Sequence, residues 1–562
     1  MAECFGSVNH TMRWQIALAV GVPVVVGFGY WYLNKKNKPS SNIIDEHSAK
    51  TSELSLDSDT SNKVSQKRQQ KTPLEEATAV KEKGNTFFSS GKYEEAITHY
   101  EKAIELCPQN EVMSLATFFQ NKAAAYEKLK NYDEVKKACN AALALNPKYT
   151  KALLRRAKAY EQTKELALAF EDFTAVCILE NFQSQSTLLA ADTLLNELAR
   201  KNAKEALAKR VPTIPSSYFI TTYFSTFIND PVHAFSNKIE GDHSKGFLKA
   251  VDLMKKKDYD NVIAACTEEI NMTEAESLYK NEALVLRGTF HQLCGNYPAA
   301  MADLDIVINN EKTDVKLRVN AIIKRACIHI QLEDPTKCFE DFEKAIKIDP
   351  DNADIYHHRG QINLMIDKPE EAAKDITLAA DLNPNYSVTA VQKCYTDYRC
   401  AMLVRDENKL KSVMQRFEQL ITDYPQCAEC YSLYAQVLSS QCEYVKSDKL
   451  YQKALKVDPN NATLLLFRAI LKLKWTGDIE AAVGLIKEAL EIDDKCSFGY
   501  EQLGTIEVQR GNLKKGIELF DKAINLARTE LEMTHYFTLK NAAEAQQTVL
   551  EKMNITLPFN NI

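Results

Sequence analysis

A segment of 34 residues recurs along this chain, and its spacing of small residues and prolines limits the folds that the chain can adopt. The first copy spans residues 77–110, with Gly84 at its eighth place, Ala96 at its twentieth and Ala103 at its twenty-seventh. Small side chains at those three places let two antiparallel helices approach closely. Pro108 ends the second helix, because proline cannot continue it. Each copy is therefore predicted to be a helical hairpin.

The copies follow one another in both halves of the chain. Units 116–149 and 150–183 repeat the pattern directly after the first copy, and about eight more units follow from residue 243 onward. A last helix, from roughly residue 531 to residue 552, would cover the final apolar face. This spacing is typical of the tetratricopeptide repeat. The expected fold class is all-α, a tetratricopeptide-repeat superhelical solenoid in two parts.

Five polar side chains fall at near-equivalent places in the first helices of the first three hairpins. They are Lys81 and Asn85 in the first hairpin, Asn121 in the second, and Lys151 and Arg155 in the third. Stacked hairpins place their first helices along one concave wall, so these side chains should converge on a shared groove. Three cations and two amides, with no acidic residue at the five places, indicate a groove that binds acidic peptide ends. The alternative is that they are ordinary solvated residues of a solenoid surface.

The same concave places in later repeats carry apolar side chains. They are Tyr398, Met402, Leu466, Phe467 and Ile470. An apolar inner wall would suit hydrophobic segments of a protein cargo, with no fixed sequence required. The alternative is that these residues belong to the ordinary core and that the predicted register is displaced by one residue.

Residues 14–33 form the one membrane candidate in the sequence. They carry no formal charge and, at about 1.5 Å rise per residue, would span roughly the 30 Å hydrocarbon core of a bilayer. Trp14 at one end and three consecutive aromatic residues near the other suit the two interfaces. A cleaved signal peptide is the alternative, but its apolar region would be only about 7–15 residues long. An uncleaved single-pass anchor is therefore expected.

The charges beside this segment predict its orientation. Lys35, Lys36 and Lys38 follow the apolar residues, whereas Arg13 and the acidic Glu3 precede them. Because cytosolic flanks carry the excess of Lys and Arg, the large C-terminal part should face the cytosol. The segment does not identify the membrane that holds it, since it would suit both the mitochondrial outer membrane and the membrane of the endoplasmic reticulum.

Composition changes mark the expected domain boundaries. The polar stretch after the anchor lacks Phe, Trp and Tyr and cannot bury enough apolar surface to order itself. A stretch rich in proline and aromatic residues interrupts the repeats in the middle of the chain. The expected division is a short N-terminal segment (1–13), a transmembrane anchor (14–33), a disordered tether (34–73), an N-terminal clamp domain of three repeats plus a capping helix (74–210), a connector (211–242) and a C-terminal domain of about eight repeats plus a terminal helix (243–562).

Charge and cysteine content exclude several classes of function. With 70 basic and 76 acidic residues the net charge is only −6, so the overall charge of the chain does not favour the binding of nucleic acid. The 14 cysteines are scattered through predicted helices and are expected to be reduced thiols. Cys427 and Cys430 form a CxxC pair without a second pair at zinc-site spacing, which favours a coincidence at a repeat turn. No cofactor or metal is expected.

An enzyme is the competing class of function. A membrane-anchored enzyme that uses its repeats to recruit substrate would need a catalytic domain, yet repeats fill nearly all of 77–530. No phosphate-binding glycine loop and no recognisable catalytic order of residues stands in the remaining segments. The chain is therefore predicted to act by binding alone.

Several segments together resemble one known family. These are MRWQIALAVG (12–21), TAVCILENFQ (174–183), YHHRGQ (356–361) and GTIEVQRGN (504–512), combined with the anchor, the tether and the three clamp-bearing repeats. They resemble the 70-kilodalton receptor subunit of the mitochondrial outer-membrane translocase. The resemblance covers essentially the whole chain, except that residues 230–245 show no distinctive match.

This resemblance implies a docking receptor in the mitochondrial outer membrane. The N-terminal repeats would bind the acidic C-terminal tails of the cytosolic 70- and 90-kilodalton heat-shock chaperones. The C-terminal repeats would take the preprotein, such as an inner-membrane carrier, and pass it to the pore formed with other subunits of the translocase. The clamp places of that family match Lys81, Asn85, Asn121, Lys151 and Arg155 without substitution. A chaperone-docking adaptor in the endoplasmic-reticulum membrane is the alternative.

Overall fold

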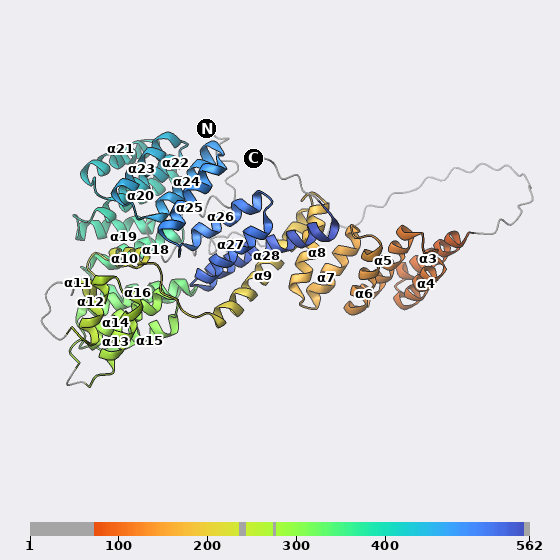
Figure 1. Cartoon of the computed structure of the whole chain (residues 1–562), viewed down its shortest axis with the longest axis horizontal. Helices are drawn as coiled ribbons and strands as arrows, with labels where there is room; N and C mark the ends of the chain where they lie inside the picture. Colours follow the sequence, from red (N-terminus) through yellow and green to blue (C-terminus); the bar gives the residue numbers. More distant parts are fainter. Residues whose placement is uncertain (1–71, 235–242, 274–276, 556–562) are drawn as a thin grey trace, which may run out of the picture. The chain divides into compact units, whose positions relative to one another are not determined.

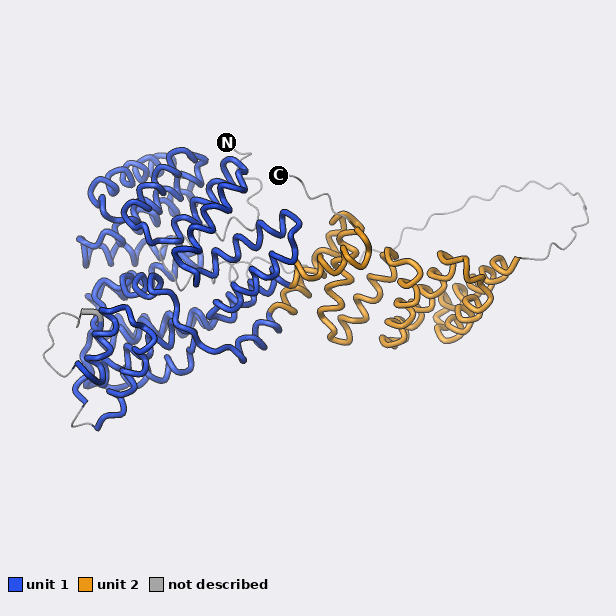
Figure 2. The backbone as a smooth tube through the Cα atoms, in the orientation of Figure 1, with its two compact units in different colours: residues 1–37, 200–540, 559–562 blue, residues 38–199, 541–558 orange. Residues whose placement is uncertain are grey.

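The computed structural model describes residues 72–234, 243–273 and 277–555, and every regular element in these ranges is a helix (Figure 1). Consecutive helices pair into antiparallel hairpins that stack one on the next. This arrangement confirms the predicted all-α tetratricopeptide solenoid. The described part of the chain falls into two compact units, coloured orange and blue in Figure 2.

The N-terminal unit contains the described residues 72–199 together with 541–555. Three hairpins make up most of it, and the long helix α9 starts within it. The bounds are α3 (Pro73–Ser89), α4 (Tyr93–Leu106), α5 (Val112–Lys128), α6 (Tyr132–Leu145), α7 (Thr150–Gln162), α8 (Leu166–Leu179) and α9 (Gln185–Lys209).

The C-terminal unit contains the described residues between 200 and 540. It begins with two short helices, continues through eight hairpins and ends in the first part of α28. The bounds are α10 (Ser217–Ser225), α11 (Pro231–Ala234), α12 (Gly246–Lys256), η4 (Tyr259–Asn261), α13 (Val262–Ile270), α14 (Lys280–Leu293), α15 (Tyr297–Asn309), α16 (Val315–Gln331), α17 (Pro335–Ile348), α18 (Ala353–Met365), α19 (Pro369–Leu382), α20 (Ser387–Val404), α21 (Glu407–Asp423), α22 (Ala428–Ser440), α23 (Tyr444–Val457), α24 (Ala462–Thr476), α25 (Ile479–Ile492), α26 (Ser497–Gln509), α27 (Leu513–Leu526) and α28 (Glu530–Met553).

The small residues of the repeat act as predicted, by letting the paired helices touch. A Cβ atom added to Gly84 in α3 would lie only 2.7 Å from the ring of Tyr100 in α4. Ala96 and Ala103, on the facing side of α4, are fully buried. A larger side chain at these places would force the two helices apart, because protein interiors have no room for added atoms.

An ion pair between the two helices of a hairpin was not expected from the sequence. In the third hairpin the Arg156 guanidinium in α7 donates two hydrogen bonds to the buried Asp172 carboxylate in α8, at 2.7 and 2.6 Å. Two parallel N–H···O bonds fix both groups more firmly than a single contact. The same pair, with the same spacing of 16 residues, recurs as Arg287–Asp303, Arg325–Asp341 and Arg359–Asp375.

The terminal helix α28 contributes to both units. Met533 and Tyr536 in its first part pack with Ala523 and Ile524 of α27 in the C-terminal unit. In its second part Val549 joins the core of the third hairpin of the N-terminal unit, with residues such as Val176. Lys552 also forms an ion pair with Glu171 at 2.5 Å within that unit. The expected boundaries at residues 210 and 242 stay predictions.

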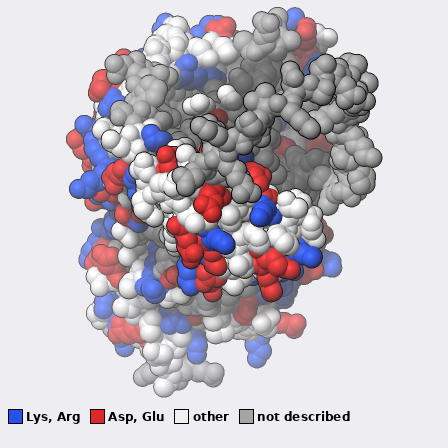
Figure 3. Space-filling view, turned by 90° about the vertical axis from the view of Figure 1, so that its right-hand side faces the viewer, with Lys and Arg blue, Asp and Glu red and all other residues white. Residues whose placement is uncertain are grey.

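The predicted anchor (14–33) and the tether up to residue 71 lie outside the described residues. Within the ranges that the structure does describe, no helix is both long enough and apolar enough to cross a bilayer. On the face shown in Figure 3, basic and acidic side chains are intermingled and neither sign covers the surface, in keeping with the small net charge.

Candidate functional site

The five predicted clamp residues come from the first helices of the three N-terminal hairpins. Lys81 and Asn85 lie on α3, Asn121 on α5, and Lys151 and Arg155 on α7. The stacking of successive hairpins brings these first helices side by side, and α5 and α7 are in direct contact. We refer to these five residues together as the clamp.

The two amides of the clamp meet directly. Asn121 donates from Nδ2 to Asn85 Oδ1 at 3.3 Å, across the boundary between the first and second hairpins. The hydroxyl of Tyr100, on the second helix of the first hairpin, donates to the same oxygen at 2.9 Å. These two donors fix the orientation of the Asn85 amide, because both bind the same oxygen. The Nδ2 group of Asn85 then donates to Glu82 Oε2 at 3.0 Å.

Arg155 extends the clamp to the third hairpin. Its Nη1 donates to the main-chain carbonyl of Gln120 at 3.4 Å, and Gln120 directly precedes Asn121. Its Nε donates to Glu127 Oε2 at 2.7 Å. A guanidinium carries five N–H groups, so these two bonds leave donors for an incoming carboxylate. The structure therefore brings Asn85, Asn121 and Arg155 together.

The lysines of the clamp differ in their surroundings. Lys81, whose side chain is 17% exposed, pairs with the neighbouring Glu82. That ammonium and the Asn85 amide hold the pKa of Glu82 below its usual range through hydrogen bonds. Lys151 is exposed and has no hydrogen bond or ion pair within the described part of the chain. It is thus available to a ligand without losing an internal partner.

Two carboxylates in the clamp were missed by the sequence analysis. Glu82 follows Lys81 directly, and Glu127 lies on α5, beyond Asn121 in the direction of the C-terminus. Only the five matching places were considered, and none of those is acidic. In the structure each of these carboxylates forms an ion pair with a cation of the clamp. Glu82 pairs with Lys81, and Glu127 pairs with Arg155. An acidic ligand would have to displace them.

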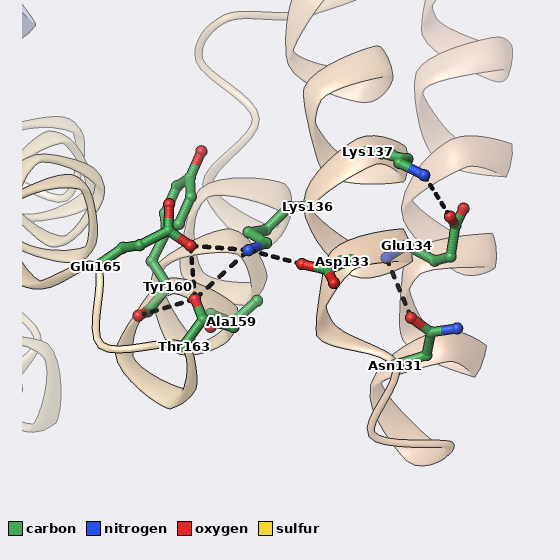
Figure 4. A network of polar contacts seen from close by, with 9 residues as sticks. All are labelled: Asn131, Asp133, Glu134, Lys136, Lys137, Ala159, Tyr160, Thr163 and Glu165. Carbon is green, nitrogen blue, oxygen red and sulfur yellow. Dashed lines mark hydrogen bonds and ion pairs between the residues drawn. The ribbon is translucent and has the colours of Figure 1, made fainter.

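A network centred on Lys136 holds the second and third hairpins together (Figure 4). The ammonium of Lys136, on α6, contacts Asp133 at 2.9 Å and Glu165 at 2.8 Å, and Glu165 lies just before α8. The Thr163 hydroxyl donates to the same Glu165 carboxylate at 2.7 Å. The hydrogen bonds that Lys136 donates to Glu165 and Asp133 raise the pKa of this lysine. The network ties α6 to the turn between the helices of the third hairpin.

A cavity of about 590 Å³ lies inside the C-terminal unit. Its walls come from the first helices α18, α20, α22, α24 and α26, from the start of α28 and from α10. Five carboxyl groups and two cations line it, together with apolar side chains such as Leu464, Phe467 and Phe498. The charged residues are Glu429, Asp458, Asp493, Glu501, Glu532, Lys495 and Arg528.

Helix α10 is held in the wall of this cavity by hydrogen bonds to later repeats. The Tyr218 hydroxyl donates to Asp458 Oδ2 at 2.7 Å, and the Ser216 hydroxyl donates to Asp493 Oδ2 at 2.8 Å. The Tyr386 hydroxyl, just before α20, donates to the carbonyl of Ser225 at 2.6 Å. Two of the five cavity carboxylates are therefore already engaged by α10 and the residue before it.

Several polar atoms on the cavity wall have no partner. Gln361 Oε1, Gln392 Nε2, Glu429 Oε1 and Asn461 Oδ1 are buried and make no hydrogen bond within the described ranges. Burying a polar group without a partner costs about 1–3 kcal/mol. Burial, followed by the charge of Cys427, raises the pKa of Glu429 to about 8. A ligand with its own hydrogen-bond donors and acceptors could form hydrogen bonds with these polar atoms.

Only one of the five apolar residues predicted to contact cargo lines the cavity. Phe467 is in its wall. Leu466 is fully buried in a neighbouring core, and Tyr398 and Ile470 are buried in the core between α20 and α24. Met402 packs against that same core. The structure thus does not bring the five together on one surface, and a role for Tyr398, Met402, Leu466 and Ile470 in cargo binding stays a prediction.

The lengths of the helices vary along the C-terminal repeats. Helices α20 and α21 contain 18 and 17 residues, whereas α22 and α23 contain 13 and 14. A fixed repeat of 34 residues cannot place concave positions correctly across such a long hairpin. Among the residues that the structure describes, no group of three or more His, Cys, Asp or Glu side chains is arranged to hold a metal ion.

Comparison with known proteins places the repeats and the whole chain in a family. Models described as "TPR repeat" and "Tetratricopeptide repeat" match residues 84–130, 116–149, 319–352 and 342–374. The mitochondrial import receptor subunit TOM70 of Homo sapiens is 41% identical, over 97% of this chain and 94% of its own length. The protein of the same name from Saccharomyces cerevisiae is 26% identical over 84% of this chain and 80% of its own length.

A solved structure agrees with these relatives. The crystal structure of the yeast Tom70 covers 86% of this chain and 99% of its own length, with 25% sequence identity and a TM-score of 0.50. The identity to the human protein extends over nearly the full length of both chains, so the similarity is not limited to a few repeats. The chain belongs to the TOM70 family of mitochondrial import receptor subunits.

Proposed function

We propose that this protein is an import receptor of the mitochondrial outer membrane that docks cytosolic heat-shock chaperones and accepts the preproteins they carry. Binding alone is its activity. The import role is supported by the family, whose named members are mitochondrial import receptor subunits. The chaperone-docking role is supported by one observation above the others. Asn121 donates to Asn85 at 3.3 Å, and Arg155 donates at 3.4 Å to the main-chain carbonyl of Gln120, the residue before Asn121, so hydrogen bonds link the first helices of all three hairpins.

The clamp suits the acidic C-terminal tails of the 70- and 90-kilodalton chaperones. A chain that ends in aspartate offers two adjacent carboxylates, and each hydrogen bond from a charged donor contributes about 1.5–3 kcal/mol. Arg155 can grip a carboxylate through two parallel N–H groups, while Lys81 and Lys151 act as point charges. The amides of Asn85 and Asn121 add directional donors without adding charge.

Titration with one peptide in two forms tests this docking role. A peptide that ends in Glu-Glu-Val-Asp should bind with a free C-terminal carboxylate and at least about tenfold more weakly when that carboxylate is amidated. The difference isolates the terminal carboxylate, because the side chains are the same in both forms. Equal affinity for the two peptides, measured by isothermal calorimetry, would remove the clamp from the proposal.

The cavity of the C-terminal unit is proposed as the preprotein site. Its apolar side chains suit hydrophobic segments, its carboxyl groups suit basic residues, and its unpartnered amides suit main-chain groups of a bound segment. Phe467 is the residue of the predicted cargo set that lies in this wall. The inner-membrane carriers, which are hydrophobic, are the class of cargo that fits it.

Photo-crosslinking distinguishes the cavity from the rest of the solenoid. A carrier peptide that bears a photoreactive group should attach to residues on the first helices α22, α24 and α26, such as Glu429, Thr463 and Phe498. The second helices α21, α23 and α25 serve as the control, because none of their residues lines the cavity. Attachment confined to these second helices would rule out the cavity.

The single-pass anchor at residues 14–33, with the bulk of the chain in the cytosol, is part of the same proposal. The family supports the mitochondrial outer membrane, and the flanking lysines support the orientation. Asn271 and Asn461 stand in glycosylation sequons, and a cytosolic solenoid would leave both unmodified. Glycan on either residue would overturn the orientation. Recovery of the tagged protein with the endoplasmic reticulum after fractionation would overturn the location.

A further inference from the structure

Two cysteines stand together at the start of helix α22, on the wall of the cavity. Cys427 is the residue before the helix and Cys430 is its third residue, and the Cys430 N–H donates to the Cys427 carbonyl at 3.2 Å. The Cys427 side chain is half-buried and lines the cavity, whereas Cys430 lies fully buried behind it. The pair is therefore one thiol that solvent can reach and one that it cannot.

The separation of the two cysteines suits a bond between them. Residues three apart in the first turn of a helix have Cα atoms about 5 Å apart, inside the range of roughly 4.4–6.8 Å found in disulfides. The two side chains also meet, since the Cys430 thiol forms a hydrogen bond with the Cys427 side chain. The pair lies at the turn between two repeats, as the sequence indicated, and this turn forms part of the cavity wall.

The surroundings of Cys427 favour its thiolate form. A hydrogen bond from the Cys430 thiol is the largest of the causes that lower the pKa of Cys427 to about 6, and the Ser387 hydroxyl adds to it. The neighbouring Glu429 has its pKa raised to about 8 by burial, so at neutral pH it places little negative charge beside the thiolate. Eleven other described cysteines have raised pKa values, which burial causes in nearly all of them.

We propose that Cys427 and Cys430 form a redox-active dithiol on the cavity wall, which a hydroperoxide closes to a disulfide. The Cys427 thiolate attacks one peroxide oxygen, the O–O bond breaks, and the leaving hydroxide takes a proton to become water. This leaves Cys427 as a sulfenic acid. The Cys430 sulfur then attacks Cys427 Sγ, forming the S–S bond while the S–O bond breaks. The second oxygen leaves as water with the Cys430 proton.

The step is balanced and gives each cysteine a distinct role. The two thiols lose two protons and two electrons in total, and hydrogen peroxide accepts them to give two molecules of water. Cys427 is the attacking residue because it is reached from the cavity and carries the thiolate. Cys430 resolves the sulfenic acid because it lies directly behind it. This site does not depend on the proposed chaperone or cargo binding.

Thiol reactivity in the intact full-length chain tests the site without any substitution. Between pH 6 and pH 8 the rate of Cys427 alkylation by iodoacetamide should rise about twofold, against roughly seventyfold for an unperturbed thiol of pKa about 8.5. Cys442, which is exposed, controls for access of the reagent. A Cys427 rate that rises as steeply as that of a model thiol would overturn the proposal.

Oxidation products give the second, independent readout. Hydrogen peroxide at low excess should produce a loss of two hydrogens, mapped by mass spectrometry to a disulfide between Cys427 and Cys430, before Cys442 is oxidised. Cys430→Ser should stop at a sulfenic acid on Cys427 that dimedone traps, and Cys427→Ser should abolish the early product. A disulfide from Cys427 to a different cysteine, or oxidation of Cys442 first, would contradict the assignment.

Discussion

Replacing Asp230 by Ala should destabilise the C-terminal unit by about 3–5 kcal/mol, the cost of removing one partner of a buried ion pair. Lys324 in α16 is completely buried, and its ammonium lies 3.0 Å from Asp230 Oδ2. The ring centroids of Phe224 and Phe227 lie 5.6 and 5.1 Å from that nitrogen. Without the carboxylate the ammonium would stay buried and lose this ion pair. Hydrogen exchange of the α16 amides should accelerate about a hundred- to several-thousandfold.

A compensated variant separates the charge from the packing. Asp230→Leu combined with Lys324→Met removes both charges and keeps apolar volume, so it should retain most of the stability that either single change loses. Asp230 also accepts from Asn320 at 3.3 Å and from the main chain of Val232 at 2.9 Å, so some loss should remain in the double variant. If the α16 amides of Asp230→Ala exchange as slowly as those of the wild type, the pair of Asp230 and Lys324 is not needed for stability.

Replacing Arg155 by Ala should weaken the binding of an acidic chaperone tail by about 2 kcal/mol, or roughly thirtyfold. Arg155 is the one clamp residue able to grip a carboxylate with two parallel donors. Isothermal titration of the free-carboxylate peptide measures the change. Lys158→Ala is the control, because it removes one exposed cation from the same helix at a place outside the clamp. Unchanged affinity in Arg155→Ala would contradict the clamp.

Glu127→Gln is the matched variant of this experiment. It leaves Arg155 in place but removes the carboxylate that now engages its Nε at 2.7 Å. Because a partly exposed ion pair contributes only about 0–1 kcal/mol, the tail should bind up to about fivefold more tightly to this variant. Weaker binding would instead assign Glu127 the role of holding Arg155 in position for the ligand.

The repeat architecture could be predicted because it follows from local packing rules. Gly84 and Ala103 sit where two neighbouring helices touch, and only a small side chain fits there in any hairpin of this kind. The clamp was predictable for the same reason, since equal places in stacked repeats face the same wall. The two carboxylates beside the clamp were not, because Glu127 and Arg155 are 28 residues apart and no sequence pattern links the conformations of their side chains.

The sequence by itself determined the all-α class and the phase of the first three hairpins, because both depend on contacts within one repeat or between adjacent repeats. On the same ground it predicts the five residues of the clamp. The tertiary structure decided the cavity, the place of α10 in its wall and the buried pair of Asp230 with Lys324, which are 94 residues apart. It also decided which cysteines face the cavity. Such features depend on how eight hairpins and α10 pack around one another. Small differences in helix length also accumulate along the solenoid, until the repeat period no longer predicts which side chain faces inward.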